Sequence, residues 1–236
     1  MKRIIGILGG MGPEATAYFY ELIIKKTKAE KDQEHIKVVI YSNPEIPPRT
    51  DAILEDGPSP APLLLEGVRR LMKAGADFIV MPCVTAHHFM PEVIAQDRFE
   101  FLNLLDESLR WTRANIPSVK TVGLIASTGT LKSRLFHDTF EKARIDVIGP
   151  EEAEQDMVMA AIFGKEGIKA GFTEGRPRKI IADIAKALID RGAEAIIAGC
   201  TEVPLVLKAE DIPVPLIEPL SIMAEAAILR AGYKVK

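Results

Sequence analysis

Two cysteines are the residues of this chain best suited to chemistry, and the sequence contains no others. Cys83 and Cys200 lie far apart, and each is followed within two residues by a threonine, Thr85 and Thr201 respectively. A thiol has an ordinary pKa of about 8.5, so it can accept or supply a proton near neutral pH. The pair therefore indicates proton transfer, provided that the fold brings both thiols to one site.

Two thiols on opposite faces of a flat carbanion would form a racemisation device. One thiolate would remove a proton from carbon, and the opposed thiol would deliver a proton to the other face. A cysteine ionises readily only beside a helix N-terminus or a polar neighbour. We expect a helix to begin after each cysteine, so that its dipole favours the thiolate. Neighbouring side chains that could bond the thiols or position a substrate are Thr85, Thr201, His87 and Glu202.

Other interpretations of the cysteines fit less well. A lone cysteine is usually an inert buried residue, but the matched surroundings of these two argue against that. Two cysteines do not make a disulfide framework, and their wide separation excludes a CxxC redox site. A zinc site would need more ligands than the cysteines with His87 or His88, and no spacing supports one. We therefore expect no metal.

An internal repeat gives a reason for the two cysteines to meet. Residues 74–83 read AGADFIVMPC and residues 191–200 read RGAEAIIAGC, 117 positions further on. Residues 5–8 (IGIL) and 122–125 (VGLI) are separated by the same 117 positions. Two segments that share one offset predict a duplication. Open parallel sheets bind ligands at the carboxyl ends of their strands, so we expect two halves facing each other across a cleft that both cysteines enter.

The elements that would position these residues alternate between strand and helix along the whole chain. Apolar strands separated by helices predict the α/β class, with parallel sheets covered on both faces. The expected strands are 4–8, 38–41, 78–81, 121–125, 145–148, 195–198 and 214–217, with 101–104 a weaker candidate. The expected helices are 14–28, 63–74, 131–143, 153–163, 177–191 and 221–229.

The duplication also predicts two domains. We expect residues 1–115 with 212–236 to form the first α/β domain, and residues 116–211 to form the second. In this division the strand at 214–217 returns the chain to the first domain, and the helix at 221–229 packs there.

Composition limits the range of functions. The net charge is −3 with no block of like charges, so nothing calls for a nucleic-acid or anionic-membrane partner. The longest apolar runs have the length of strands, which excludes a bilayer-spanning segment. The N-terminal apolar run is too short for a signal peptide and leads directly into Gly9 and Gly10. We therefore expect a cytoplasmic protein.

Several motifs together resemble the aspartate/glutamate racemase superfamily, and in particular its aspartate racemase branch. They cover essentially the whole chain: GILGGMGPEAT at 6–16, NPEIPPRT at 43–50, PCVTAH at 82–87 and GCTE at 199–202. The Gly-rich N-terminal segment alone would be weak evidence for a family. It matches neither the GxGxxG nor the GxxxxGK[ST] nucleotide-binding motif.

The resemblance implies a fold, a reaction and a set of site residues. It implies two pseudo-symmetric flavodoxin-like domains with the active site in the cleft between them, and catalysis by Cys83 and Cys200 without pyridoxal phosphate, metal or nucleotide. The substrate would be an acidic amino acid, aspartate first, and the assembly a homodimer. Arg49 would bind one substrate carboxylate, and Lys169 in the GIKAG segment at 167–171 would bind the other. A dianionic substrate needs such cationic anchors, for which arginine offers a bidentate fork.

One position departs from the family pattern. The family usually has asparagine after the first cysteine, whereas this chain has Val84. Valine offers a backbone N–H and an apolar wall, so the substrate preference could move away from aspartate. Further candidate substrate-binding residues are Met11 after the first strand and Thr128 and Thr130 after its counterpart. The last two could instead be ordinary helix-capping residues.

Three functions remain open on this sequence. The first is racemisation of aspartate, with glutamate or a broader set of amino acids as alternatives. The second is another isomerase or decarboxylase reaction on the same scaffold. The third is a non-catalytic protein that binds a small carboxylate, although such a protein would have no need of a thiol on each face.

Overall fold

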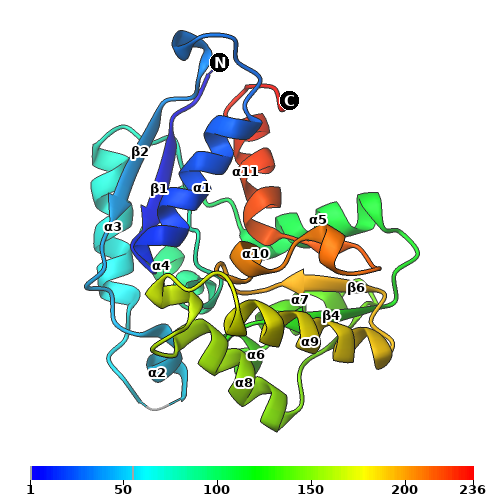
Figure 1. Ribbon diagram of the computed structural model, residues 1–236. Coiled ribbons are helices and arrows are strands. Elements are labelled where there is room, and N and C mark those ends of the chain that lie inside the picture. The colour runs from blue at the N-terminus through cyan, green and yellow to red at the C-terminus, as the bar shows by residue number, and fades with distance from the viewer. Residues whose placement is uncertain (1, 55) are drawn as a thin grey trace. The chain divides into compact units, whose positions relative to one another are not determined.

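The computed structural model describes residues 2–54 and 56–236, and the chain divides into two units. The first unit comprises Met1–Glu107 with Leu220–Lys236, and the second comprises Ser108–Pro219. Strands and helices alternate in both, which confirms the predicted α/β class (Figure 1).

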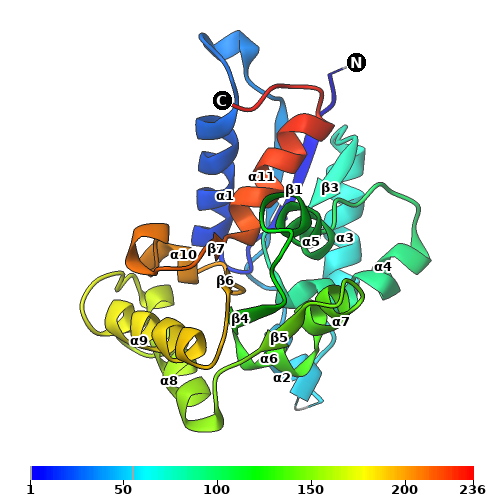
Figure 2. The same cartoon turned by 90° about the vertical axis from the view of Figure 1, so that its right-hand side faces the viewer.

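The first unit is built on a three-stranded parallel sheet of order β2-β1-β3. Helix α3 packs against one face of β1, and α1 lies on the opposite side beside α11 (Figures 1 and 2). Its elements are β1 Ile5–Gly9, α1 Pro13–Lys26, β2 Val38–Ser42, α2 Arg49–Leu54, α3 Ala61–Lys73, β3 Phe78–Val80, the 3-10 helix η2 Thr85–Phe89, α4 Met90–Gln96 and α11 Pro219–Arg230. Helix α5, Leu104–Asn115, runs across the division between the units.

The second unit is built on a four-stranded parallel sheet of order β5-β4-β6-β7. Helices α8 and α9 pack against each other, and α9 also lies against β4 and β6 (Figure 2). Its elements are β4 Thr121–Ile125, α6 Thr128–Lys132, α7 Leu135–Glu141, β5 Asp146–Ile148, α8 Glu152–Phe163, the 3-10 helix η3 Ile168–Ala170, α9 Arg176–Asp190, β6 Ala195–Ala198, α10 Val203–Val206 and β7 Leu216–Ile217.

The strand register reproduces the predicted repeat. Gly6 of β1 lies opposite Ile79 of β3, and Gly123 of β4 lies opposite Ile196 of β6, with both members displaced by 117 positions. A side chain at either glycine would collide with its neighbours: a Cβ atom at Gly6 would lie 2.7 Å from Ala76 Cβ, and one at Gly123 would lie 2.8 Å from Ile196 Cδ1. The two halves therefore share strand order, register and the same close approach at an equivalent glycine.

The strand expected at 214–217 lies in the second sheet, which corrects its predicted assignment to the first domain. Leu216 and Ile217 pair with Ile196 and Ile197 of β6, and the amide of Ile196 donates to Pro215 O at 3.0 Å. The chain therefore enters the first unit only with α11, which does pack there as expected.

Two other expected elements differ in detail. The helix expected at 131–143 is divided into α6 and α7, because Arg134 adopts a left-handed backbone conformation with φ of 55°. The weak strand at 101–104 is reduced to a single bridge between Phe101 and Ile79. It ends there because Asn103 caps α5, its side chain accepting from the amide of Leu105 at 2.9 Å.

Candidate active site

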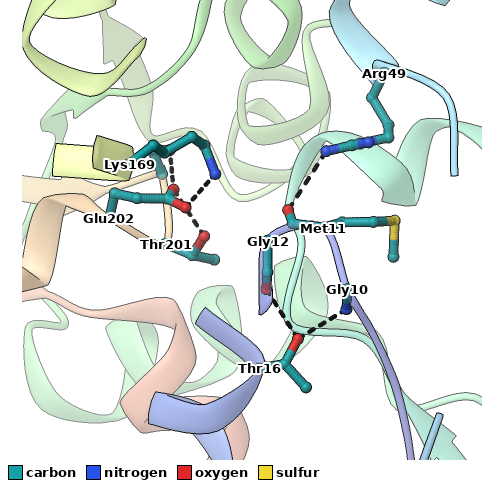
Figure 3. A network of polar contacts seen from close by, with 9 residues as sticks. Gly10, Met11, Gly12, Thr16, Arg49, Lys169, Thr201 and Glu202 are labelled. Atoms are coloured by element: carbon teal, nitrogen blue, oxygen red, sulfur yellow. Dashed lines mark hydrogen bonds and ion pairs between the residues drawn. The ribbon is translucent and has the colours of Figure 1, made fainter. Parts of the chain in front are cut away.

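In the first unit, the loop after β1 is fixed by the hydroxyl of Thr16. That hydroxyl accepts from the amide of Gly10 and donates to the carbonyl of Gly12, both at 2.9 Å (Figure 3). Gly10 has φ of 97°, and a Cβ there would lie 2.4 Å from the backbone of Asn43, so only glycine is tolerated. The loop that carries Met11 is thereby held in one conformation, with the Met11 side chain buried.

Replacement of Thr16 by valine is expected to lower the free energy of unfolding by about 1 to 3 kcal/mol, because the buried Gly10 amide loses its acceptor and the Gly12 carbonyl keeps only the Thr16 amide as donor. Denaturant unfolding measures this change. Thr139→Val is a matched control, since that hydroxyl donates to the carbonyl of Leu135 within helix α7. The control should change stability by about 0.5 kcal/mol or less. Equal effects in the two variants would contradict a special role for Thr16.

Arg49 begins helix α2 and directs its guanidinium at backbone carbonyls. Nη1 donates to the carbonyls of Ile46 and Pro47 at 3.1 and 2.9 Å, and Nη2 donates to that of Met11 at 3.5 Å (Figure 3). Nε is buried without a hydrogen-bond partner. The side chain is therefore tied to the Met11 loop and retains a buried donor, which is a suitable arrangement for an anion anchor.

Cys83 lies three residues after the end of β3 and is buried, with 6 % of its surface exposed. The turn that carries it is held by His87, whose Nδ1 lies 2.9 Å from the carbonyl of Cys83. The other ring nitrogen, Nε2, accepts from the amide of Leu104 at 3.3 Å. This assigns the proton to Nδ1, because Nε2 must be unprotonated to accept.

His87 is therefore committed to backbone groups, and the expectation that it bonds a thiol or a substrate is not met. It is 4 % exposed, with its ring 5.3 Å from that of Phe101, and burial lowers its pKa to about 4. The ring is neutral near pH 7, and its role is to hold the turn that follows β3.

In the second unit, Cys200 lies after β6 and bonds a carboxylate. Its Sγ donates to Oε2 of Glu202 at 2.9 Å, and the hydroxyl of Thr201 donates to the same oxygen at 3.0 Å. Lys169 forms an ion pair with the other oxygen, Oε1 (Figure 3). Three residues that the sequence singled out separately, Lys169, Thr201 and Glu202, thus meet in one network at Cys200.

The electrostatic surroundings of Cys200 differ from the sequence expectation. Burial first, and then the negative charge of Glu202, raise the pKa of the Cys200 thiol well above its usual range. The helix that follows is α10, of four residues, so it offers little dipole to offset these effects. Cys200 is therefore a thiol near neutral pH, and the prediction that a helix favours its thiolate is wrong.

The loop after β4 contains a helix cap. Ser127 is the N-cap of α6, and its hydroxyl accepts from the amide of Thr130 at 3.4 Å. Thr130 is 1 % exposed and its hydroxyl lies 3.2 Å from that of Ser127. Thr128 is half-buried and receives a hydrogen bond from the Gln155 side chain at 3.1 Å. Capping thus accounts for Thr130, while Thr128 is the more accessible of the two candidate substrate ligands.

Val84 is 3 % exposed and precedes the 3-10 helix η2, in which Thr85 is half-buried.

Sequence reasoning missed two residues that order the loops after the first strand of each half, Thr16 and Gln155. Thr16 lies inside a motif that was noted, four residues after Gly12, which is a spacing typical of a side chain bonding back within a helical turn. Gln155 carries no such signal, because it reaches the carbonyl of Ala126 from a separate helix.

Within residues 2–54 and 56–236, no group of three or more His, Cys, Asp or Glu side chains is placed to hold a metal ion. Among the helices in those same ranges, none has the length and apolar character needed to cross a membrane.

Comparisons with known proteins agree with the geometry. Residues 8–227 match the family described as Asp/Glu/hydantoin racemase. The solved aspartate racemase of Picrophilus torridus is 31% identical, with a TM-score of 0.88 over 99% of this chain and 96% of that one. The broad specificity amino-acid racemase RacX of Bacillus subtilis is 26% identical, over 95% of this chain and 96% of that protein.

A more distant match concerns the fold alone. A glutamate racemase from Francisella tularensis, solved with D-glutamate, is 16% identical, with a TM-score of 0.69 over 98% of this chain and 82% of that one. The family match spans most of the sequence and includes both cysteine segments, so this chain belongs to the Asp/Glu/hydantoin racemase family.

Proposed function

We propose that the protein is an amino-acid racemase in which Cys83 and Cys200 are the paired acid and base, with aspartate as the first substrate. One observation carries the proposal. The only two cysteines of the chain follow equivalent strands, β3 and β6, of two halves that share strand order and register. Such a pair suits a racemase, since two-base inversion at carbon uses one proton-transfer group on each face of the substrate.

The proposed reaction has two balanced proton transfers. The thiolate of Cys83 takes the α-proton of the amino acid, and the electron pair of the broken C–H bond remains on the substrate as a planar carbanion. The thiol of Cys200 then donates its proton to the opposite face of the α-carbon. The enzyme is left with Cys83 as thiol and Cys200 as thiolate, which is the state needed for the reverse direction. This mechanism requires both sulfurs to reach one α-carbon from opposite sides.

Arg49 and Lys169 are the proposed anchors for the two substrate carboxylates. The buried, unpartnered Nε of Arg49 supports its role, because a bound anion would supply the missing acceptor. Lys169 is paired with Glu202, but an ammonium group carries three N–H donors, so this ion pair does not prevent it from binding a second anion. We also retain Met11, Val84, Thr85 and Thr128 as proposed lining residues.

Incubation with L-aspartate in deuterated water, without added cofactor, tests the proposal. We expect D-aspartate to accumulate until the two enantiomers are equal, with deuterium at the α-carbon, because each inversion takes the new proton from a solvent-exchanged thiol. Chiral chromatography with mass spectrometry measures both quantities. Absence of both D-aspartate and deuterium uptake over a panel of amino acids would overturn the proposal.

A broader substrate range is the second candidate, and Val84 favours it. The buried valine replaces a polar residue usual in the family, and one relative is a broad specificity amino-acid racemase. If this candidate holds, glutamate and neutral amino acids in the same assay will be racemised at rates within about tenfold of aspartate, a difference of about 1.4 kcal/mol or less. A strong preference for aspartate alone would contradict it.

The scheme uses protein groups alone, so activity without added pyridoxal phosphate, metal or nucleotide is part of the proposal. The homodimer and the cytoplasmic location stay predictions.

A further inference from the structure

Glu202 is a buried carboxylate whose hydrogen bonds and ion pair lie in the immediate surroundings of one sulfur, that of Cys200. Its side chain is 6 % exposed. Oε2 accepts from the Cys200 thiol and from the Thr201 hydroxyl, and Oε1 is held by Lys169. A carboxylate bound at both oxygens cannot rotate freely, so it presents a fixed acceptor to the Cys200 S–H.

The position in the first half that corresponds to Glu202 carries no charge. The position 117 residues before Glu202 is Thr85, which stands two residues after Cys83 as Glu202 stands two residues after Cys200. The repeat is therefore symmetric in its strands and its sulfurs but not at this position. A neutral hydroxyl occupies it beside one cysteine and a carboxylate occupies it beside the other.

The sign of this charge decides what it can do. A negative group in contact with sulfur opposes formation of a second negative charge there, and a hydrogen bond accepted from S–H stabilises the protonated form. Glu202 therefore favours the thiol form of Cys200, whereas a group that activates a cysteine nucleophile favours the thiolate.

We propose that Glu202 is the positioning residue that keeps the proton on Cys200 and aims it, so that the free enzyme starts with Cys200 as its acid and Cys83 as its base. Lys169 supports this arrangement by fixing the second oxygen of the carboxylate. The raised pKa of Cys200 agrees with it, since Glu202 contributes to that rise after burial. The catalytic meaning of this assignment rests on the proposed racemisation.

The thiol itself can be titrated without any assay of activity. Cys83→Ser leaves Cys200 as the sole thiol of the chain, and the pH dependence of its alkylation by iodoacetamide reports its ionisation. Adding Glu202→Gln should move the alkylation midpoint down by about 1 pH unit or more, because a contacting charge is removed. Glu210→Gln is the matched control, an exposed glutamate of the same unit, and should leave the midpoint in place.

Glu202→Gln leaves Lys169 without its carboxylate, so the double variant Glu202→Gln with Lys169→Met removes both charges and guards against a folding defect. Its midpoint should also lie below that of the Cys83→Ser parent. A midpoint that is unchanged or higher in the folded variants overturns the proposal.

A kinetic measurement separates this inference from the racemase proposal. With both cysteines present, Glu202→Gln should move the basic limb of the kcat–pH profile to lower pH by a similar number of pH units. This shift is expected in the reaction direction in which Cys200 donates its proton. A protein that shows the alkylation shift but no racemisation of any amino acid would uphold the role of Glu202 at Cys200 and refute the reaction. Racemisation without the alkylation shift would uphold the reaction and refute the role of Glu202 at Cys200.

Discussion

Replacement of either Cys83 or Cys200 by alanine is expected to lower the rate of racemisation by about two to four orders of magnitude. The loss corresponds to one general acid or base, whose contribution to a proton transfer is about 10²- to 10⁴-fold. Alanine cannot accept or supply a proton, so inversion lacks one of its two steps in each variant. Stopped assays with chiral separation of aspartate measure the rates.

The two variants should differ from each other in a way that a general loss of folding would not produce. Each retains one thiol, which can remove an α-proton and return a solvent-derived one to the same face. We therefore expect each variant to exchange the α-proton of one enantiomer in deuterated water, and the two variants to select opposite enantiomers. Racemisation at the full rate in either variant would refute the two-base mechanism.

Serine replacements provide a matched control for packing. Cys83 is buried in the apolar cluster of the first unit, so Cys83→Ala removes one heavy atom from a packed region, whereas serine keeps the size of the side chain. A hydroxyl is far less acidic than a thiol, so Cys83→Ser should be as inactive as Cys83→Ala. Activity in the serine variant alone would point to packing rather than proton transfer.

The strands could be predicted from the sequence because buried parallel strands are short, apolar on both faces and bounded by turn residues. The strands at 121–125 and 195–198 were predicted at their observed bounds. The repeat of 117 positions added a long-range constraint that propensity lacks, and the paired glycines, Gly6 and Gly123, show its physical basis. Each lies where the neighbouring strand and the loop that leads into it approach too closely for a Cβ.

Elements whose place depends on tertiary pairing could not be predicted in the same way. The apolar run at 214–217 signals a strand, but nothing in its composition says which sheet edge it joins. Its partner β6 is fixed by hydrogen bonds that also involve Pro215. Arg134 gives no sequence signal for a left-handed residue, although its side chain forms ion pairs with Asp138 and Glu141.

The residues of the candidate site could be predicted from the sequence, but the electrostatic interactions among them could not. Both cysteines were identified from their equivalent places in the repeat. The ion pair between Lys169 and Glu202 joins residues 33 positions apart across separate elements, so charge spacing gave no hint of it. The same holds for His87, whose position beside Cys83 suggested chemistry, although its ring bonds the backbone on both sides.

His87 should make the stability of the first unit depend on pH between about 6.5 and 4. Its pKa is about 4 in the folded chain, below the ordinary value of 6.5, because burial disfavours the charged ring. As the pH falls through this window, the unfolded chain takes up a proton that the folded chain does not. The free energy of unfolding therefore decreases with falling pH, by about 2 to 3 kcal/mol at pH 4.5 relative to pH 7.5.

Replacement of His87 by glutamine isolates this contribution, since glutamine offers a donor and an acceptor but does not titrate in this range. Denaturant unfolding at pH 7.5 and pH 4.5 should show a smaller loss of stability in His87→Gln than in the parent, by about 2 kcal/mol or more. His88→Gln is the matched control, because the neighbouring His88 is exposed, and it should lose as much stability as the parent. Equal pH dependence in His87→Gln and His88→Gln would mean that His87 titrates normally in the folded chain and does not hold the Cys83 turn as a neutral ring.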